Sequence, residues 1–114
     1  MALFRVGPLP ADPMAAAAAF HADVQPRLIA TLDAAAGPVT LVFAPADHAH
    51  REWRMAAVAM LARARAPQRV NAVESAYEPA IAAAAAYLAG AEGVTGQVLP
   101  LDSLGAGDVI ASRG

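Results

Sequence analysis

The sequence predicts an α/β fold in which helices cover both sides of a short, mostly parallel four-stranded sheet, giving a three-layer sandwich. Three observations support this prediction. Strand-like and helix-like segments alternate along the chain, proline or glycine separates them, and the central strand is a continuous apolar run typical of parallel sheets. The length of 114 residues predicts a single domain over residues 1–114. Alanine contributes 33 residues, which favours closely packed helices.

The first half of the chain predicts a strand, a long helix and a second strand. The short apolar run at 2–6 is followed by glycine and proline and is typical of a strand. Asp12 precedes a proline and predicts the N-cap of a helix over 14–36. Pro26 lacks an amide hydrogen, so it should kink or divide that helix. The β-branched and apolar run at 39–44 predicts a strand that is buried on both faces.

The second half repeats this alternation twice. A helix is predicted over 51–66 and carries two apolar stripes, which predicts two buried faces. A strand at 69–73, a helix over 79–90 and a last strand at 98–101 follow, and the segment from Ser103 shows no periodicity and is predicted to be loose. Because strands and helices alternate, we expect right-handed crossovers between parallel strands.

Composition excludes several functions. The chain has no cysteine, and all eight of its basic residues are arginines, so neither thiolate nor lysine chemistry is available. The formal charge of -2 lacks the basic excess that nucleic-acid binding needs, so we expect no nucleic-acid partner. The uncharged stretches are too short to span a bilayer, and no export signal is expected. We therefore expect a cytoplasmic protein with no membrane partner.

Three segments carry a resemblance to a known family. Residues 55–64 are similar to the KAAVxxLxRA helix of short-chain dehydrogenases/reductases, residues 69–73 to their RVNAI strand, and residues 82–102 to their closing YLAS…VTGQVLxVDGG segment. From about Phe20 to Asp102, the chain thus resembles the C-terminal half of that family. The resemblance implies a Rossmann-like domain that lacks the N-terminal dinucleotide-binding half.

The resemblance does not extend to the family's chemistry. Arg51 stands where the family has its catalytic tyrosine, and Met55 stands where it has its lysine. Ala44 and Pro45 occupy the region of the activating serine, and Glu74-Ser75 replaces the Pro-Gly that borders the nicotinamide. The 114 residues contain no glycine-rich G-x-x-x-G-x-G turn to receive a pyrophosphate. We therefore expect a pseudoenzyme with no catalytic residues and no cofactor.

Association is the function that remains under this interpretation. The resemblance implies that residues 95–97, the helix before them and the last strand contact another subunit. The small residues of the 51–66 helix and the alanine face of the 14–36 segment favour close packing of helices across a two-fold axis. We expect a homodimer, or alternatively an accessory subunit of a full-length dehydrogenase of this family or another biosynthetic enzyme. The predicted interface residues are Met55, Ala59, Ala62, Ala66, Tyr87 and Gln97.

A second hypothesis uses the loop after the central strand. Asp47, His48 and His50 follow the carboxyl end of that strand, where α/β proteins commonly bind ligands. Two imidazoles and a carboxylate, with His21 as a further ligand, could bind a metal or serve in a small enzyme. The simpler interpretation is a solvated helix start capped by Asp47.

The remaining conspicuous side chains have structural explanations. Trp53 lies on an apolar stripe of the 51–66 helix and is predicted to pack in the core. Arg54, Arg63 and Arg65 could grip a phosphate, but their spacing favours a solvated polar edge of that helix.

Overall fold

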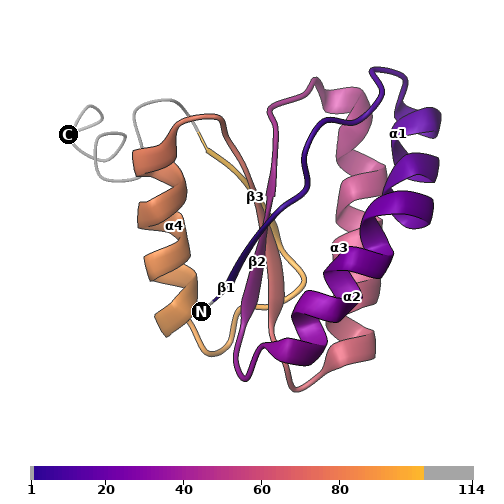
Figure 1. Cartoon of the computed structure of the whole chain (residues 1–114). Coiled ribbons are helices and arrows are strands. Elements are labelled where there is room, and N and C mark those ends of the chain that lie inside the picture. Colours follow the sequence, from indigo (N-terminus) through magenta and orange to yellow (C-terminus); the bar gives the residue numbers. More distant parts are fainter. Residues whose placement is uncertain (1, 102–114) are drawn as a thin grey trace.

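The computed structural model describes residues 2–101 and contains a four-stranded parallel sheet (Figure 1). The strand order follows the chain: β1, β2, β3, β4. Every pair of neighbouring strands is parallel, including the edge strand β1 and its neighbour β2. The predicted α/β fold is therefore confirmed. The strands are β1 (Ala2–Arg5), β2 (Val39–Phe43), β3 (Val70–Glu74) and β4 (Val98–Pro100).

Helices cover both faces of this sheet, unequally. One face carries three α-helices and the other carries only α4 within the described residues (Figure 1). The α-helices are α1 (Pro13–Ala19), α2 (Gln25–Ala34), α3 (Arg51–Arg65) and α4 (Glu78–Gly90). No helix in the described part of the chain is long and apolar enough to cross a membrane. The predicted loose segment from Ser103 lies outside the described residues.

The long helix predicted over 14–36 is divided as Pro26 requires. A π-helical segment, Phe20–Val24, joins α1 to α2, and the amide of Gln25 donates to the carbonyl of Phe20. Pro26 has no amide hydrogen to donate to the carbonyl four residues earlier, so one wider turn fits before it. The helix ends at Ala34, two residues earlier than predicted.

The expectation of right-handed crossovers is wrong for the last connection. The β1 to β2 and β2 to β3 connections run through helices on one face, whereas α4 connects β3 to β4 on the opposite face (Figure 1). Because all strands are parallel and follow chain order, a helix on the opposite face reverses the hand of the crossover.

Buried polar groups hold the unusual return into β4. The Asn71 side chain donates to the carbonyl of Val94 at 3.0 Å and accepts from the amide of Gln97 at 3.0 Å. Gly96 has a φ of 76°, and a Cβ there would lie 3.5 Å from the Cβ of Ala62 on α3. Glycine fits at this tight turn before the last strand because other residues rarely adopt this φ.

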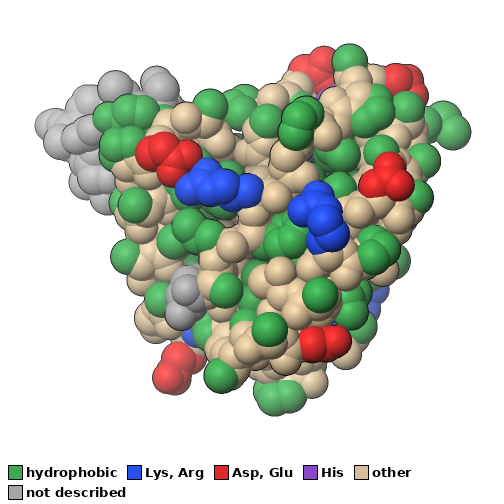
Figure 2. All heavy atoms as spheres, in the orientation of Figure 1, with side chains coloured by type: hydrophobic (Ala, Val, Ile, Leu, Met, Phe, Trp, Pro, Cys, Tyr) green, Lys and Arg blue, Asp and Glu red, His purple; other side chains and the backbone are tan. Residues whose placement is uncertain are grey.

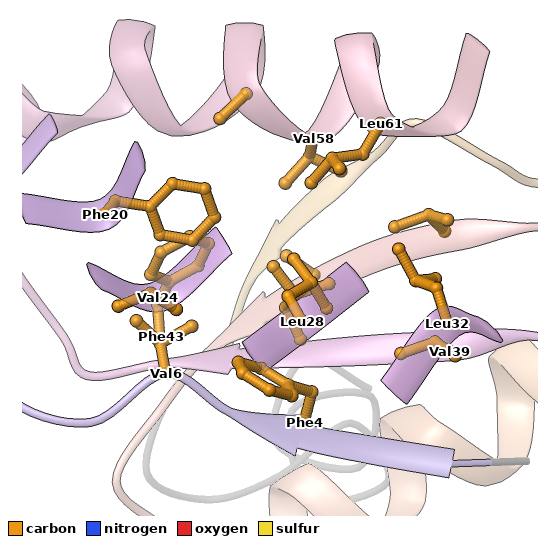
Figure 3. Packing of buried hydrophobic residues seen from close by; sticks show 14 of the residues in the cluster. Phe4, Val6, Phe20, Val24, Leu28, Leu32, Val39, Phe43, Val58 and Leu61 are labelled. Atoms are coloured by element: carbon orange, nitrogen blue, oxygen red, sulfur yellow. The ribbon is translucent and has the colours of Figure 1, made fainter. Parts of the chain in front are cut away.

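The larger part of the core lies between the sheet and the layer of α1, α2 and α3 (Figure 3). Phe20, Phe43 and Trp53 form an aromatic cluster with ring centroids 5.6–5.8 Å apart. Leu28 and Leu32 of α2 are buried beside it. The predicted core position of Trp53 is confirmed by its packing against this cluster, although its side chain is only half-buried.

Candidate functional site

The loop after β2 forms a capped helix start. Asp47 Oδ1 accepts from the amide of Ala49 at 3.0 Å and caps a 3₁₀ turn, His48–His50, that leads into α3. His48 is exposed. This arrangement confirms Asp47 as an N-cap, whereas the expectation of a solvated helix start is wrong for His50, which is buried.

His50 is engaged by the protein itself. Its side chain is buried, its Nδ1 accepts from the Trp53 indole at 3.1 Å, and its Nε2 donates to the carbonyl of Ala11 at 3.0 Å. An indole can only donate and a carbonyl can only accept, so this geometry fixes one neutral tautomer. The third histidine, His21, lies away from this loop, in the π-helical segment between α1 and α2, where it contacts Gln25. Among residues 2–101, no group of three histidines and acids is placed to hold a metal, so the loop does not form the metal cluster considered above.

The positions that correspond to the dehydrogenase chemistry lie around the start of α3. Arg51 is exposed, and Met55 is half-exposed. The carbonyl of Ala44 and the carboxylate of Glu74 both accept from the Nη1 of Arg54, at 2.9 and 2.8 Å. Arg54, Ala44 and Glu74 thus form a packed polar contact beside these two positions.

Arg54 is a buried residue that the sequence analysis misplaced on a solvated edge. Its side chain is 5% exposed, and its guanidinium lies 4.4 Å from the centroid of the Phe43 ring. The prediction fails because a neighbouring strand end supplies Glu74, which allows a charged group inside the fold. The Glu74 that replaces the family's Pro-Gly and the arginine on the helix were both visible in the sequence, but their pairing depends on the tertiary fold. Of the other two, Arg63 is exposed and Arg65 pairs with Asp33 at 2.8 Å.

A pocket of about 290 Å³ lies next to the pair of Arg54 and Glu74. Its walls come from the segments that follow β1 and β2, from the 3₁₀ turn and from Arg54. The lining residues are Gly7, Leu9, Pro10, Ala11, Phe43, Ala44, Pro45, Ala46, Asp47, His50 and Arg54. The pocket therefore lies at the carboxyl edge of the sheet, the usual ligand position in parallel α/β folds.

The six predicted interface residues do not share one surface. Ala62 is buried under the turn at Gly96, so it is unavailable to a partner. Tyr87 is 63% exposed but lies on α4, in the layer opposite α3. Gln97 is exposed in the return to β4, and Ala66 is exposed just beyond α3. Helical periodicity correctly places Ala59 and Ala62 on one stripe of α3, but it cannot show that the turn at Gly96 packs against part of that stripe.

The outward surface of α3 is nevertheless apolar at its centre. Met55 and Met60 are each 50% exposed, Ala56 is exposed, and Ala59 is half-buried. Glu52 lies at one end of this surface and Arg63 at the other, and neither forms an ion pair within the described residues. We call these six residues the α3 outer face: Glu52, Met55, Ala56, Ala59, Met60 and Arg63.

Charged side chains on the face drawn in Figure 2 form no large field of one sign. On the side of the molecule shown in Figure 2, positive and negative groups are scattered among hydrophobic ones. Arg5 pairs with Glu78 through two hydrogen bonds of 2.8 and 2.9 Å, linking the edge strand β1 to α4.

The comparisons with known proteins agree with the fold. A family model described as "short chain dehydrogenase-like protein" matches residues 4–101, which includes all four strands apart from the start of β1. No curated protein matches the chain, and no solved structure does. Since the family model covers most of the sequence, the chain belongs to the short chain dehydrogenase-like family.

Proposed function

We propose that this protein is a non-catalytic member of its family that functions by association, first with a second copy of itself, through the α3 outer face. The observation that carries the proposal is the self-complementary order of side chains along this face. An acid stands at one end, a base at the other, and methionines and alanines lie between them.

The positions along α3 fit a two-fold axis. If two copies of α3 pack antiparallel with the axis between Ala57 and Val58, then Met55 of one copy lies at the level of Met60 of the other, and the two methionines flank the contact on opposite edges. In the same register, Ala56 meets Ala59 and Glu52 meets Arg63. Each contact occurs twice, as a two-fold interface requires. One register therefore satisfies the apolar centre and both charged ends together.

The side-chain types suit a helix–helix contact. Alanine at the centre allows two helices to approach closely, and methionine adapts its shape to fill the gaps on either side. The end charges add specificity and register more than affinity, because exposed ion pairs contribute only about 0–1 kcal/mol each. One 15-residue helix offers a limited contact area, so we expect a dissociation constant of about 1 μM for the dimer.

The non-catalytic part of the proposal is supported by the residues that replace the family's reactive groups. An arginine remains protonated at physiological pH and cannot serve as a general acid in place of tyrosine. Met55 carries no charge with which to hold a cofactor. A fluorescence titration with NADH tests this directly, and we expect no saturable binding. Saturable binding would contradict this part.

A charge exchange on the α3 outer face tests the association. In sedimentation velocity at low salt, we expect the native protein to dimerise, and Glu52→Arg and Arg63→Glu each to weaken the dimer by about tenfold because each places like charges together twice. The double variant, Glu52→Arg with Arg63→Glu, should restore the dimer. Glu92→Arg makes the same charge change at an exposed residue on the α4 to β4 connection and serves as the control.

Two results would overturn this proposal. A native protein that stays monomeric well above micromolar concentration would remove self-association and leave the accessory-subunit alternative. A dimer that neither single variant weakens would place the interface elsewhere on the molecule.

A further inference from the structure

The outer edge of β1 carries backbone groups that the sheet leaves unpaired. The amides of Ala2 and Val6 donate to carbonyls of the β2 segment, at 3.2 and 3.0 Å. Because backbone groups alternate in direction along a strand, Phe4 also turns toward β2, whereas Leu3 and Arg5 turn their N–H and C=O groups away from it. None of these four outward groups has a hydrogen-bond partner among the described residues. β1 is thus an open edge strand, which can pair with another extended chain.

The side chains beside this edge are apolar on one face of the sheet and basic on the other. On the α4 side, Leu3 is 40% exposed. On the other side, Phe4 points toward α2 (Figure 3), and the guanidinium of Arg27 from that helix lies 5.4 Å from the centre of its ring. Arg27 is exposed, and it forms no ion pair within the part of the chain that the structure describes. The edge therefore offers a cation that still lacks an acidic partner.

We propose that β1 binds an extended segment of another protein, which adds to the sheet as an antiparallel strand and places an acidic side chain beside Arg27. Antiparallel pairing lets Leu3 and Arg5 each exchange two hydrogen bonds with the residue opposite. The residue between those two lies opposite Phe4, and its side chain points to the same face, toward Arg27. Its two neighbours point to the α4 side, where Leu3 is exposed and Arg5 already has Glu78 as its partner. The segment recognised is thus an acidic residue between two apolar ones.

A second copy of this chain fits the β1 edge poorly. All four outward backbone groups pair between two copies only when Leu3 of one lies opposite Arg5 of the other, which brings the two copies of Phe4 opposite each other. Because Arg27 lies over Phe4, this register also brings two guanidiniums of like charge toward each other. An acidic segment gains a charge pair at the same place. The β1 edge shares no residue with the α3 outer face, so the two associations can be tested separately.

Three palindromic peptides test the proposal on the full chain: Thr-Val-Glu-Val-Thr, and the same peptide with glutamine or lysine at the centre, all with blocked ends. In NMR titrations, we expect the glutamate peptide to shift the amide signals of Leu3 and Arg5 saturably. It should bind about threefold more tightly than the glutamine peptide and about tenfold more tightly than the lysine peptide, because an exposed charge pair is replaced first by no charge and then by repulsion. Methylation of both valine nitrogens should abolish binding, because it removes the donors that the added strand needs.

One substitution and its control locate the charge contact. Arg27→Glu should reverse the order, so that the lysine peptide binds more tightly than the glutamate peptide. Arg51→Glu makes the same charge change at an exposed arginine at the start of α3 and should leave the order unchanged. The inference is overturned if no peptide binds at β1, if the lysine peptide binds the native protein as tightly as the glutamate peptide, if the methylated peptide binds equally well, or if Arg27→Glu leaves the order unchanged.

Discussion

The two faces of the sheet are packed with side chains of different sizes. The face under α1, α2 and α3 packs phenylalanines and leucines around an aromatic cluster. The face under α4 packs a smaller group, in which Ile81, Ala84 and Leu88 of the helix meet Val42 and Val73 of the sheet. Large apolar side chains therefore supply most of the hydrophobic stabilisation on the first face, because this contribution scales with the apolar area buried.

The α4 side compensates with hydrogen bonds. The Arg69 guanidinium donates to the carbonyls of Leu88, Ala89 and Ala91, at 2.7–3.0 Å, and so caps the end of α4. Asn71 ties the following loop to β3. The comparison teaches that an alanine-rich helix can be held in place by polar caps at its end, while the opposite layer is held by its core and leaves the outward side of α3 exposed.

Removing a large side chain from each face should give the largest effect and the clearest contrast. Phe20→Ala opens a cavity inside the aromatic cluster and should lower the free energy of unfolding by about 3–5 kcal/mol, enough to unfold a marginal domain. Leu88→Ala on α4 should cost less, within the range of about 2–5 kcal/mol for buried leucines, because fewer atoms are lost. Urea unfolding followed by circular dichroism measures both values. Equal losses would show that the α4 side depends on its core as much as the other side does.

The next largest loss of unfolding free energy should follow from replacing Asn71, whose side chain anchors the return to β4. Asn71→Ala leaves the carbonyl of Val94 and the amide of Gln97 without their partners and should cost about 1–3 kcal/mol. Hydrogen exchange should quicken first in the return to β4. Gln97→Ala is the matched control, since this exposed side chain makes only a weak contact with the carbonyl of Thr95 at 3.4 Å. If the two variants unfold at the same urea concentration, the anchoring role assigned to Asn71 is wrong.

Local signals in the sequence predicted the elements well. Asp12 accepts from the amide of Ala15 at 2.9 Å and caps α1 as the Asp-Pro pair indicates, and Pro26 divides the following helix. Such features depend on a few neighbouring residues, whose chemistry is visible in the chain. The observed ends of elements differ from the predicted ends by one or two residues where distant groups intervene. One example is the end of α2, where the Gln68 side chain donates to the carbonyl of Leu32 in the last turn and to that of Gly37 beyond the helix.

Tertiary pairings were not predictable in the same way. Arg54 was expected at a solvated edge because helical spacing alone cannot show that the end of β3 brings Glu74 within 2.8 Å. Ala62 was expected at an interface because periodicity identifies an apolar stripe but not what covers it, here the turn at Gly96. The hand of the last crossover likewise depends on the packing of α4 and not on any local pattern.

The smallest effect is expected at the exposed ion pair that links the edge strand β1 to α4. Arg5 of β1 pairs with Glu78 of α4, but the side chains are 53% and 66% exposed, so water screens their attraction. The hydrogen bonds and the charge of Glu78 raise the pKa of the Arg5 guanidinium, so the pair favours the charged form of this side chain. Arg5→Met should leave the urea midpoint unchanged at both low and high salt. A drop that appears only at low salt would show that the thinly packed α4 side needs this surface pair, and would reverse the conclusion that polar caps and a small core suffice to hold it.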